Sequence, residues 1–256
     1  MSDTGRKAVV LGVEIDKLTM GEVLEKVHEA ILSKSAFSIG VVNAAKLVNM
    51  KQNKALHRDV VSSEIVLADG MSVVWASGVL GNALPERVPG IDLMHAMMQR
   101  GSDLGYRFFL FGAREDVSRE VERKMSELYP NAIVAGRRNG YFKPEDEEDI
   151  VNNIAASNAD ILLVAITSPI KERFMARWRD KLNVAVIHGV GGSFDVMAGK
   201  AKRAPQWMQN FGLEWLYRLL QEPTRLAWRY ARTNTLFIAY VIRDWFSRTF
   251  KRNQDL

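Results

Sequence analysis

Apolar and polar positions follow two different periods along most of the chain. Continuous apolar runs such as YRFFLFGA (106–113) and ADILLVAIT (159–167) are typical of strands buried on both faces. Other segments place apolar residues at helical spacing, as in MGEVLEKVHEAILSK (20–34), which Thr19 precedes as a helix cap. Strands that alternate with helices of about 10–15 residues indicate βαβ units. We therefore predict an α/β fold with a Rossmann-like, mostly parallel sheet flanked by helices.

The remaining segments continue this alternation. Further strands are predicted at KAVVLGVEI (7–15), FSIGVVN (37–43), IVLA (65–68), NAIVAG (131–136) and VAVIHGVGG (184–192), which ends in a Gly-rich loop. Further helices are predicted at AAKLVNMKQNKALH (44–57), over the small residues after Gly70, and at DVSREVERKMSELY (116–129), PEDEEDIVNNIAAS (144–157) and PIKERFMARWRD (169–180).

Several unusual residues fall where predicted strands end. In open parallel sheets ligands bind beyond the carboxyl ends of the strands, and Asn43, Asp69 and Gly112 each lie at such an end. Asp69 and Gly70 have two interpretations: Asp69 caps the next helix while Gly70 permits the turn, or the carboxylate has a chemical role. These residues alone leave both open.

Two further stretches are candidates for binding phosphate. GVGGSFD (189–195) carries Gly191 and Gly192, which let backbone N–H groups approach a ligand, although the run matches neither common phosphate-loop pattern and also suits a tight turn. RVPGID (87–92) reads either as a Pro-Gly turn with Asp92 capping a helix, or as a site where the Arg87 fork holds a diphosphate. His188 adjoins the first run and suits either a structural or a functional role.

The amino-acid composition excludes several kinds of site and segment. The chain has 256 residues, of which 47% are hydrophobic and 25% charged, as in globular proteins. It has no Cys, so disulfides and thiolate metal sites are excluded. The acidic run 145–149 is interpreted as a solvated helix start, and His pairs at metal spacing are absent, so we predict a metal-independent reaction without a cofactor. The N-terminal residues lack the apolar core of a signal peptide, and no apolar run approaches the roughly 20 residues of a membrane span.

Charge divides the chain into two predicted parts. Residues 201–256 hold ten Lys or Arg and four Asp or Glu, a net +6, which leaves −1 for residues 1–200 because the whole chain carries +5. We predict a body, 1–200, and a basic helical appendage, 201–256, in which Pro223 begins a helix. Such asymmetry indicates an anionic partner, either a membrane or a nucleic acid.

The appendage itself has two interpretations. The segment 236–242 is apolar, Trp228 and Trp245 flank it, and the spacing of Arg225, Arg229 and Arg232 places them on one helix face. The helix either docks on the body with its basic face in water, or lies on an anionic membrane surface.

Eight motifs in register give the chain a family resemblance over roughly residues 8–232. They are VVNAAKLV, LADGMSVVWASG, RVPGID, FLFGA, GYF, TSPIKERFM, GVGGSFDVMAG and RAPQWMQNFGLEWLYRLLQEPTR. In this combination the chain resembles the WecB/TagA/CpsF glycosyltransferase family. The resemblance implies transfer of a sugar from a UDP-sugar to a polyprenyl-diphosphate-linked saccharide at the cytoplasmic face of the bacterial inner membrane. Such enzymes build enterobacterial common antigen, teichoic-acid linkage units and capsular or exopolysaccharide repeats.

The resemblance also implies roles for individual residues. Asp69 matches the proposed catalytic base of an inverting displacement, and Arg87 with backbone N–H groups would stabilise the departing UDP without a metal. Asn43 matches a residue of the sugar pocket, while Tyr141 and Asp195 match positions that hold uridine. The full set of expected substrate-binding residues is Asn43, Gly70, Gly112, Tyr141, Lys171, Glu172, Gly191, Gly192 and Asp195. Those expected to meet the lipid diphosphate or the membrane are Arg218, Arg225, Arg229 and Arg232.

Two departures from the family pattern leave the donor sugar open. Val41 stands where the family often has Thr, and Lys171 replaces the Gln of the common SPKQE motif. A cation there would pair with a carboxylate or phosphate of the substrate. Glucose, glucuronic acid and other hexoses all stay open. The family interpretation involves no nucleic acid and is compatible with a homo-oligomer.

Two other function classes compete with this interpretation. One is a Rossmann-type NAD-dependent oxidoreductase, although the chain lacks an opening GxGxxG motif. The other is a non-catalytic adaptor that uses the basic tail to bind a membrane or nucleic acid.

Overall fold

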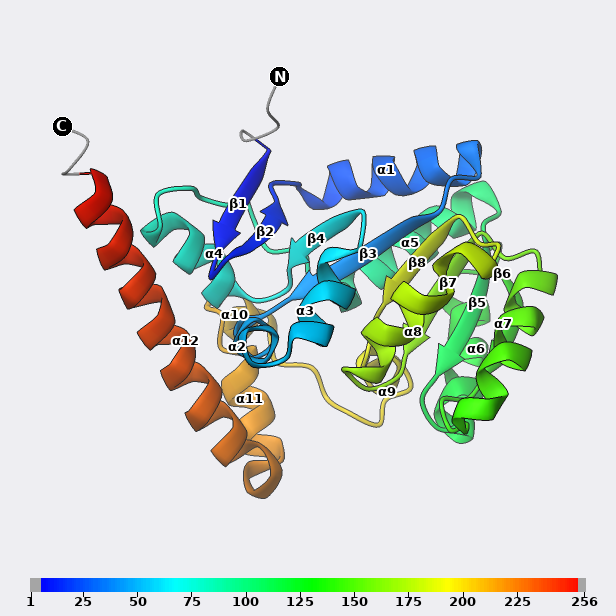
Figure 1. Ribbon diagram of the computed structural model, residues 1–256. Helices are drawn as coiled ribbons and strands as arrows, with labels where there is room; N and C mark the ends of the chain where they lie inside the picture. The colour runs from blue at the N-terminus through cyan, green and yellow to red at the C-terminus, as the bar shows by residue number, and fades with distance from the viewer. Residues whose placement is uncertain (1–5, 253–256) are drawn as a thin grey trace.

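A computed structural model describes residues 6–252, with the side chains of Arg225, Lys251 and Arg252 excepted. Its centre is a six-stranded sheet in the order β4-β3-β8-β7-β5-β6, and every neighbouring pair is parallel (Figure 1). The strands are β3 Phe37–Val42, β4 Ile65–Ala68, β5 Arg107–Gly112, β6 Ile133–Arg138, β7 Ile161–Ala165 and β8 Val186–Gly189. The predicted α/β fold with a parallel sheet is therefore confirmed.

A small antiparallel hairpin precedes this sheet. It consists of β1 Lys7–Val10 and β2 Val13–Asp16, so the prediction of one strand over 7–15 was wrong. The chain reverses because Leu11 and Gly12 both adopt positive φ, at 53° and 84°, a conformation that an apolar run does not reveal. Asp16 Oδ2 accepts a hydrogen bond of 2.8 Å from the Val66 N–H, which joins the hairpin to β4.

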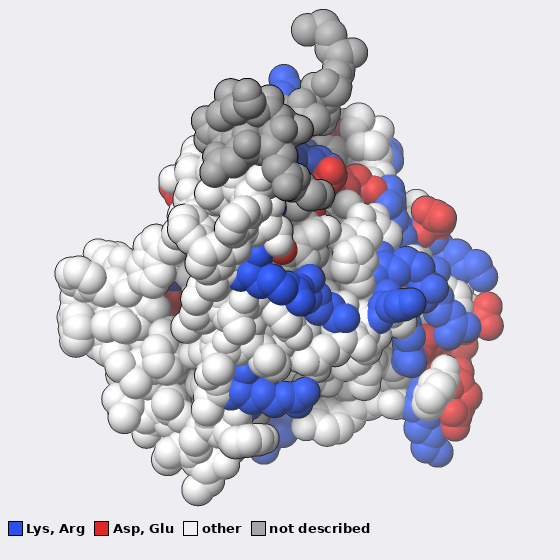
Figure 2. Space-filling model, turned by 60° about the vertical axis from the view of Figure 1, so that its left-hand side comes forward, with Lys and Arg blue, Asp and Glu red and all other residues white. Residues whose placement is uncertain are grey.

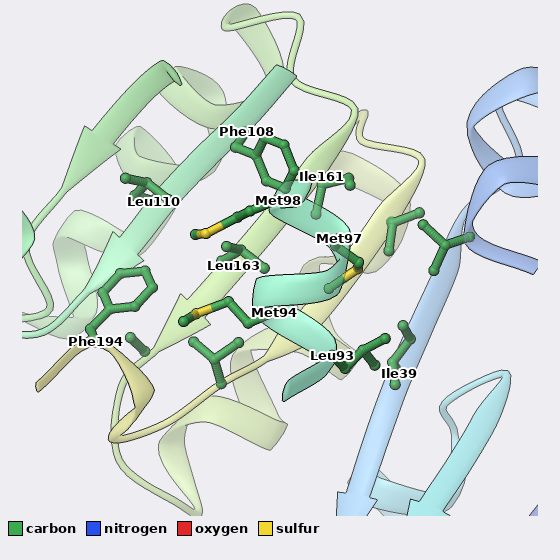
Figure 3. Packing of buried hydrophobic residues seen from close by; sticks show 14 of the residues in the cluster. Ile39, Leu93, Met94, Met97, Met98, Phe108, Leu110, Ile161, Leu163 and Phe194 are labelled. Carbon is green, nitrogen blue, oxygen red and sulfur yellow. The ribbon is translucent and has the colours of Figure 1, made fainter. Parts of the chain in front are cut away.

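One face of the sheet is covered by a Met-rich core. Side chains alternate along β5, so that Phe108 and Leu110 point to this face and Phe109 to the other. Figure 3 shows Met98 of α5 beside Phe108 and Leu110 of β5, and Met94 of the same helix between Leu163 of β7 and Phe194. The helices here are α1 Met20–Ser33, α5 Gly90–Leu104, α6 Glu115–Leu128 and α9 Ser193–Met197. Thr19 caps α1, as the sequence predicted, and the structure adds a capping box with Glu22.

The opposite face carries α2 Ala44–Gln52, α3 Lys54–Val61, α7 Glu147–Ala156 and α8 Ile170–Trp178, with short 3-10 turns at Pro144–Asp146 and Arg179–Lys181. The single helix predicted over 44–57 is two helices, because Asn53 ends α2 and its Oδ1 caps α3 at the Leu56 N–H, 3.0 Å away. The acidic run does begin a helix. Glu147 is nevertheless buried, not solvated, and its Oε2 accepts from Trp178 Nε1 at 2.9 Å.

A third group of helices lies at the β4 side of the sheet. Helix α4, Met71–Val79, packs on β1 and β4. After α10 Gln206–Asn210 and α11 Glu214–Gln221, the long α12 Pro223–Arg252 runs along the outside of α2 (Figure 1). The predicted start at Pro223 is confirmed. Across residues 6–252, none of the helices combines the length and apolar character needed to cross a bilayer.

Helix α12 uses its apolar segment in two ways. Phe237 and Val241 are buried in the core that holds β1, β2 and α2, whereas Ile238 and Ile242 are 57% and 49% exposed. The Arg248 guanidinium donates to the backbone oxygens of Val9 and Leu80, at 2.9 and 3.1 Å. The helix therefore docks on the body along one side and presents an apolar strip on the other. The division into a body and an appendage remains a prediction.

Candidate functional site

The Asp69 carboxylate joins three elements at the carboxyl end of the sheet. Its backbone N–H donates to Val42 O at 2.9 Å, which holds the ends of β3 and β4 together. Its Oδ1 accepts from the backbone N–H of Gly90, the first residue of α5, at 3.0 Å. Its Oδ2 lies 3.5 Å from Asn43 Nδ2, the long limit of a hydrogen bond. The capping residue of α4 is Gly70, so the interpretation of Asp69 as a cap for the helix it precedes was wrong.

Asn43 is oriented by the helix that follows it. Its Oδ1 accepts from the Lys46 N–H at 3.0 Å and so caps α2. That bond fixes the amide with its Nδ2 toward Asp69. Asn43 and Asp69, which the sequence placed at the same edge, are thus brought together.

His188, whose role the sequence left open, supports the start of α5. It lies on β8, fully buried, and its Nε2 donates to Gly90 O at 3.0 Å. Its Nδ1 has no hydrogen-bond partner within residues 6–252. Burial lowers the pKa of His188 to about 4, although the bond to Gly90 opposes this, so the ring is neutral at physiological pH. Gly90 is therefore held through its N–H by Asp69 and through its C=O by His188.

A buried Lys–Glu–Lys group lies at the starts of α2 and α8. Glu172 Oε1 accepts from Lys46 Nζ at 2.7 Å and lies 3.5 Å from Lys171 Nζ. Lys171 and Glu172 are 7% and 6% exposed, and Glu172 Oε2 has no hydrogen-bond partner in the described part of the chain. With Ser62 and Arg179, this group lines a cavity of about 160 Å³ between α3 and α8.

The charges of this group shift one another's pKa values. Burial, helped by the nearby Lys46 charge, lowers the pKa of Lys171 to about 8. Burial disfavours ionisation of Glu172, but Lys46 and Lys171 outweigh it and hold the pKa of this carboxyl at about 2. Glu172 is thus ionised between two ammonium groups. Lys171, expected to meet the substrate, already has a partner inside the protein.

A second group of expected residues lies beyond β5 and β8. Gly112 has φ +131°, and a Cβ there would lie 2.4 Å from the Ala165 carbonyl carbon, so the position requires glycine. Tyr141 is 70% exposed, and Asp195 is half-buried at the start of α9. Burial raises the pKa of Asp195, and Arg114, which also interacts electrostatically with Tyr141, opposes this rise.

The Gly-rich loop after β8 lies between these two groups. Gly191 has φ +53°, and Gly192 is the residue from which α9 begins. A Cβ at Gly191 would lie 3.9 Å from Lys171 Nζ. The loop therefore runs from beside Lys171 to the start of α9, which carries Asp195.

Arg87 is engaged by a carboxylate of α11. Its Nη1 donates to Glu214 Oε2, and Glu214 Oε1 lies 3.5 Å from Arg203 Nε. Arg203 Nη2 donates to Asp92 Oδ2 at 2.8 Å. Asp92 lies inside the first turn of α5, whose capping residue is Pro89, so its interpretation as a helix cap was wrong.

The basic residues expected at the membrane lie on the surface of the appendage. Arg218 is exposed on α11, and Arg229 and Arg232 are exposed on α12. Arg229 lies over the Tyr230 ring at 5.3 Å, and Arg232 Nη2 donates to Gln52 Oε1 at 3.2 Å. The Arg225 side chain is outside the described residues. Figure 2, turned to bring the α12 side forward, shows Lys and Arg in separate groups on a mostly uncharged face.

Metal ligands do not gather in the part of the chain from 6 to 252: no three His, Asp or Glu side chains form a group that could hold an ion. The metal-independent, cofactor-free reaction remains a prediction.

A comparison with protein families identifies the class of activity. The model of the Glycosyl transferase WecG/TagA/CpsF family matches residues 8–251. The chain belongs to this family. The match spans nearly the whole chain, α10 to α12 included, and confirms the resemblance seen in the sequence motifs. Glycosyl transfer in polysaccharide biosynthesis is therefore its activity class, which disfavours the oxidoreductase and adaptor alternatives.

Sequence reasoning missed several residues of this glycosyltransferase's candidate site. Lys46 lies three positions after Asn43, so its place in the first turn after a strand end was a usable signal. Arg203 and Glu214 gave no comparable signal, because their partners Asp92 and Arg87 are far away in the chain.

Proposed function

We propose that the enzyme transfers a hexose-type sugar from a UDP-sugar to a polyprenyl-diphosphate-linked saccharide with inversion at the anomeric carbon. The observation that carries this proposal is the arrangement of the Asp69 carboxylate. The Gly90 N–H holds Oδ1 at 3.0 Å, while Oδ2 has a long 3.5 Å contact with Asn43. A carboxylate fixed through one oxygen keeps the other for a proton, as a general base requires.

In the proposed reaction Asp69 Oδ2 takes the proton of the acceptor hydroxyl. The acceptor oxygen forms a bond to the anomeric carbon from the face opposite UDP. The bond from that carbon to the UDP oxygen breaks, and UDP leaves with the electron pair. Base assistance of this kind contributes about 10²–10⁴-fold to the rate. Arg87 and the backbone N–H group of Gly192 would stabilise the charge that develops on the diphosphate.

The nucleotide would lie over the ends of β5 and β8. The exposed Tyr141 ring offers a stacking surface for uracil, and Asp195 offers an acceptor for ribose or base donors. With UDP there, the sugar would extend across β7 and β8 toward Asp69.

The Lys–Glu–Lys group favours a neutral hexose as donor. Glu172 lines the cavity between α3 and α8, and its Oε2 lacks a partner in the described residues, so it would accept a hydrogen bond from a sugar hydroxyl that enters this cavity. The charge of Lys171 is already balanced by Glu172. A uronate carboxylate would therefore meet an acceptor oxygen and a neutralised cation, which favours glucose-type sugars over glucuronic acid.

The appendage would hold the enzyme at the cytoplasmic face of the membrane. Trp228, Ile238 and Phe246 expose apolar surface on α12, and Arg229 and Arg232 expose positive charge. An exposed apolar strip beside basic groups is the pattern of helices that lie on anionic bilayers. Arg218 would then face the lipid diphosphate of the acceptor, and Arg225 stays a contact predicted from the sequence alone.

A donor panel tests the proposal. Full-length enzyme is given a synthetic polyprenyl-diphosphate sugar with UDP-glucose, UDP-N-acetylmannosamine or UDP-glucuronate in separate reactions. We expect UDP release and a product of inverted configuration with a neutral hexose, and little of either with the uronate. Product with retained configuration, or no product with any UDP-sugar, would overturn the proposal.

A further inference from the structure

Two guanidinium groups from distant segments converge on one carboxylate beside Asp69. Arg87, in the loop before α5, donates to Glu214 Oε2, and Arg203, in the segment before α10, approaches Glu214 Oε1 at 3.5 Å. Asp92 holds the other two nitrogens of Arg203: Nη2 donates to Oδ2 at 2.8 Å and Nη1 donates to Oδ1. We call Arg87 and Arg203 the arginine pair. Glu214 lies between these two residues, with Oε2 toward Arg87 and Oε1 toward Arg203.

The arginine pair is fixed next to the candidate base. The Val88 N–H donates to Ala68 O at 2.8 Å, which ties the Arg87 loop to the end of β4 directly before Asp69. The Arg87 side chain is 13% exposed, and Arg203 and Glu214 are each 25% exposed. Charges at this depth interact more strongly than in bulk water, yet a dissolved anion can still reach them.

A carboxylate and a phosphate share the geometry that a guanidinium fork recognises. Glu214 meets one nitrogen of each arginine, Arg87 Nη1 and Arg203 Nε, and so occupies the position that a phosphate would take between them. We propose that Arg203 is, together with Arg87, a diphosphate-binding residue, and that Glu214 is an internal competitor that leaves the arginine pair when a diphosphate binds. This inference rests on the proposed function, in which either UDP or the lipid-linked acceptor supplies the diphosphate.

Displacement of Glu214 has a structural consequence. Glu214 is the first residue of α11, and its carboxylate links this helix to the Arg87 loop. A bound diphosphate breaks that link and leaves α11 attached through its other contacts. Occupancy of the arginine pair is thereby coupled to the position of the appendage.

Calorimetric binding to the full-length protein tests the exchange, with inorganic pyrophosphate, UDP and farnesyl diphosphate as separate ligands. Glu214→Gln keeps the side-chain size and removes the competing charge, so pyrophosphate should bind about threefold to tenfold more tightly. Arg203→Gln should weaken binding by about tenfold, and Arg203→Lys, which keeps the charge but loses the fork, should fall between Arg203→Gln and the native protein. UDP and farnesyl diphosphate are then compared with pyrophosphate. The one whose affinities follow the same order across the variants identifies the substrate, UDP-sugar or lipid-linked acceptor, whose diphosphate binds the arginine pair.

Matched variants distinguish displacement of Glu214 by the diphosphate from a general effect of net charge on anion binding. Arg100 and Glu25 form a bidentate pair, at 2.8 and 3.1 Å, at the opposite end of α5 from Gly90. Arg100→Gln lowers the net charge by one, as Arg203→Gln does, and Glu25→Gln raises it by one, as Glu214→Gln does. Both controls should leave pyrophosphate affinity unchanged. Asp92→Asn raises the local charge but leaves Glu214 in place, so its gain should be smaller than that of Glu214→Gln.

The outcomes are distinct. The inference fails if Glu214→Gln binds pyrophosphate no more tightly than the native protein, if Asp92→Asn gives an equal gain, or if neither organic diphosphate follows the order set by pyrophosphate. Arg203→Lys decides the role of Arg203 if thermal unfolding shows that Arg203→Gln is unfolded. If the diphosphates bind as expected but no UDP-sugar is turned over, the arginine pair stands and the proposed function falls.

Discussion

Asp69 Oδ1 accepts a hydrogen bond of 3.0 Å from the backbone N–H of Gly90, at the start of α5. A residue that ends β4 thus serves a helix that begins about twenty positions later, while the adjacent α4 starts from Gly70. The bond orients the carboxylate without taking both oxygens. The structural and chemical roles of Asp69 can therefore be tested separately, because substitution by Asn keeps one side-chain oxygen and replaces the other with nitrogen.

Asp69→Asn should fold normally and lose most of its transfer activity. The Asn Oδ1 still accepts from Gly90, so thermal unfolding should be close to that of the native protein. The amide nitrogen replaces the oxygen that takes the proton, so kcat should fall by about 10²–10⁴-fold. Kinetics with the donor found in the panel measure this. Activity near that of the native protein would mean that Asp69 has only the structural role.

The position of Asp69 at a strand end was predictable from the sequence, whereas its hydrogen bond to Gly90 was not. The alternation of strands and helices places Asn43 and Asp69 at neighbouring strand ends, which local sequence can indicate. The pairs Arg87–Glu214 and Lys46–Glu172 join segments 127 and 126 positions apart. Such contacts depend on how helices pack on the sheet, and this packing cannot be inferred from a single sequence. For the same reason the apolar pattern missed the hairpin turn, which depends on the backbone conformation of single residues.

The protein should lose stability as the pH falls from about 6.5 to about 4, in part because of His188. Burial lowers the pKa of His188 from 6.5 to about 4, against the opposing bond to Gly90. In this window the unfolded chain binds a proton that the folded protein does not, so the free energy of unfolding decreases. At ~1.4 kcal/mol per pKa unit, the contribution is about 3 kcal/mol at pH 4.

His188→Gln isolates that contribution, since Gln can still donate to Gly90 O but does not titrate. Urea unfolding of both proteins at about pH 7 and about pH 4.5 gives the comparison. The variant should lose less stability than the native protein over this interval. Equal losses in the two proteins would show that His188 does not have the depressed pKa.

Lys46→Met should destabilise the protein by about 3 kcal/mol, the scale of a broken buried ion pair. The variant removes the closer partner of Glu172, at 2.7 Å, and leaves the carboxylate with Lys171 at 3.5 Å. Lys143→Met is the control, because the Lys143 side chain is 78% exposed and lies 4.0 Å from Glu145. Denaturant unfolding measures both. Similar stability in the two variants would argue against a charged Lys–Glu–Lys group.

Transfer activity should survive chelation of divalent ions. In the proposed reaction Arg87 and the Gly192 N–H group stabilise the charge of the diphosphate, and Arg203 joins them as the second member of the inferred arginine pair, so that no metal ion is needed for this. The assay compares initial rates before and after treatment with EDTA. Loss of activity in EDTA, with recovery on adding Mg²⁺ or Mn²⁺, would show that an ion takes part.

The two sides of α12 should separate membrane binding from stability. Phe237 and Val241 are 5% and 9% exposed against the body, and Ile238 and Ile242, one position later in each case, are largely exposed. Ile238→Gln combined with Ile242→Gln should weaken sedimentation with vesicles containing anionic lipid and leave the unfolding temperature unchanged, because these side chains meet solvent. Phe237→Ala should instead cost about 3–5 kcal/mol of stability, as expected for a truncated core aromatic. If the exposed pair can be changed with no effect on vesicle binding, then the apolar strip of α12 does not meet the bilayer, and the basic residues alone would have to hold the enzyme there.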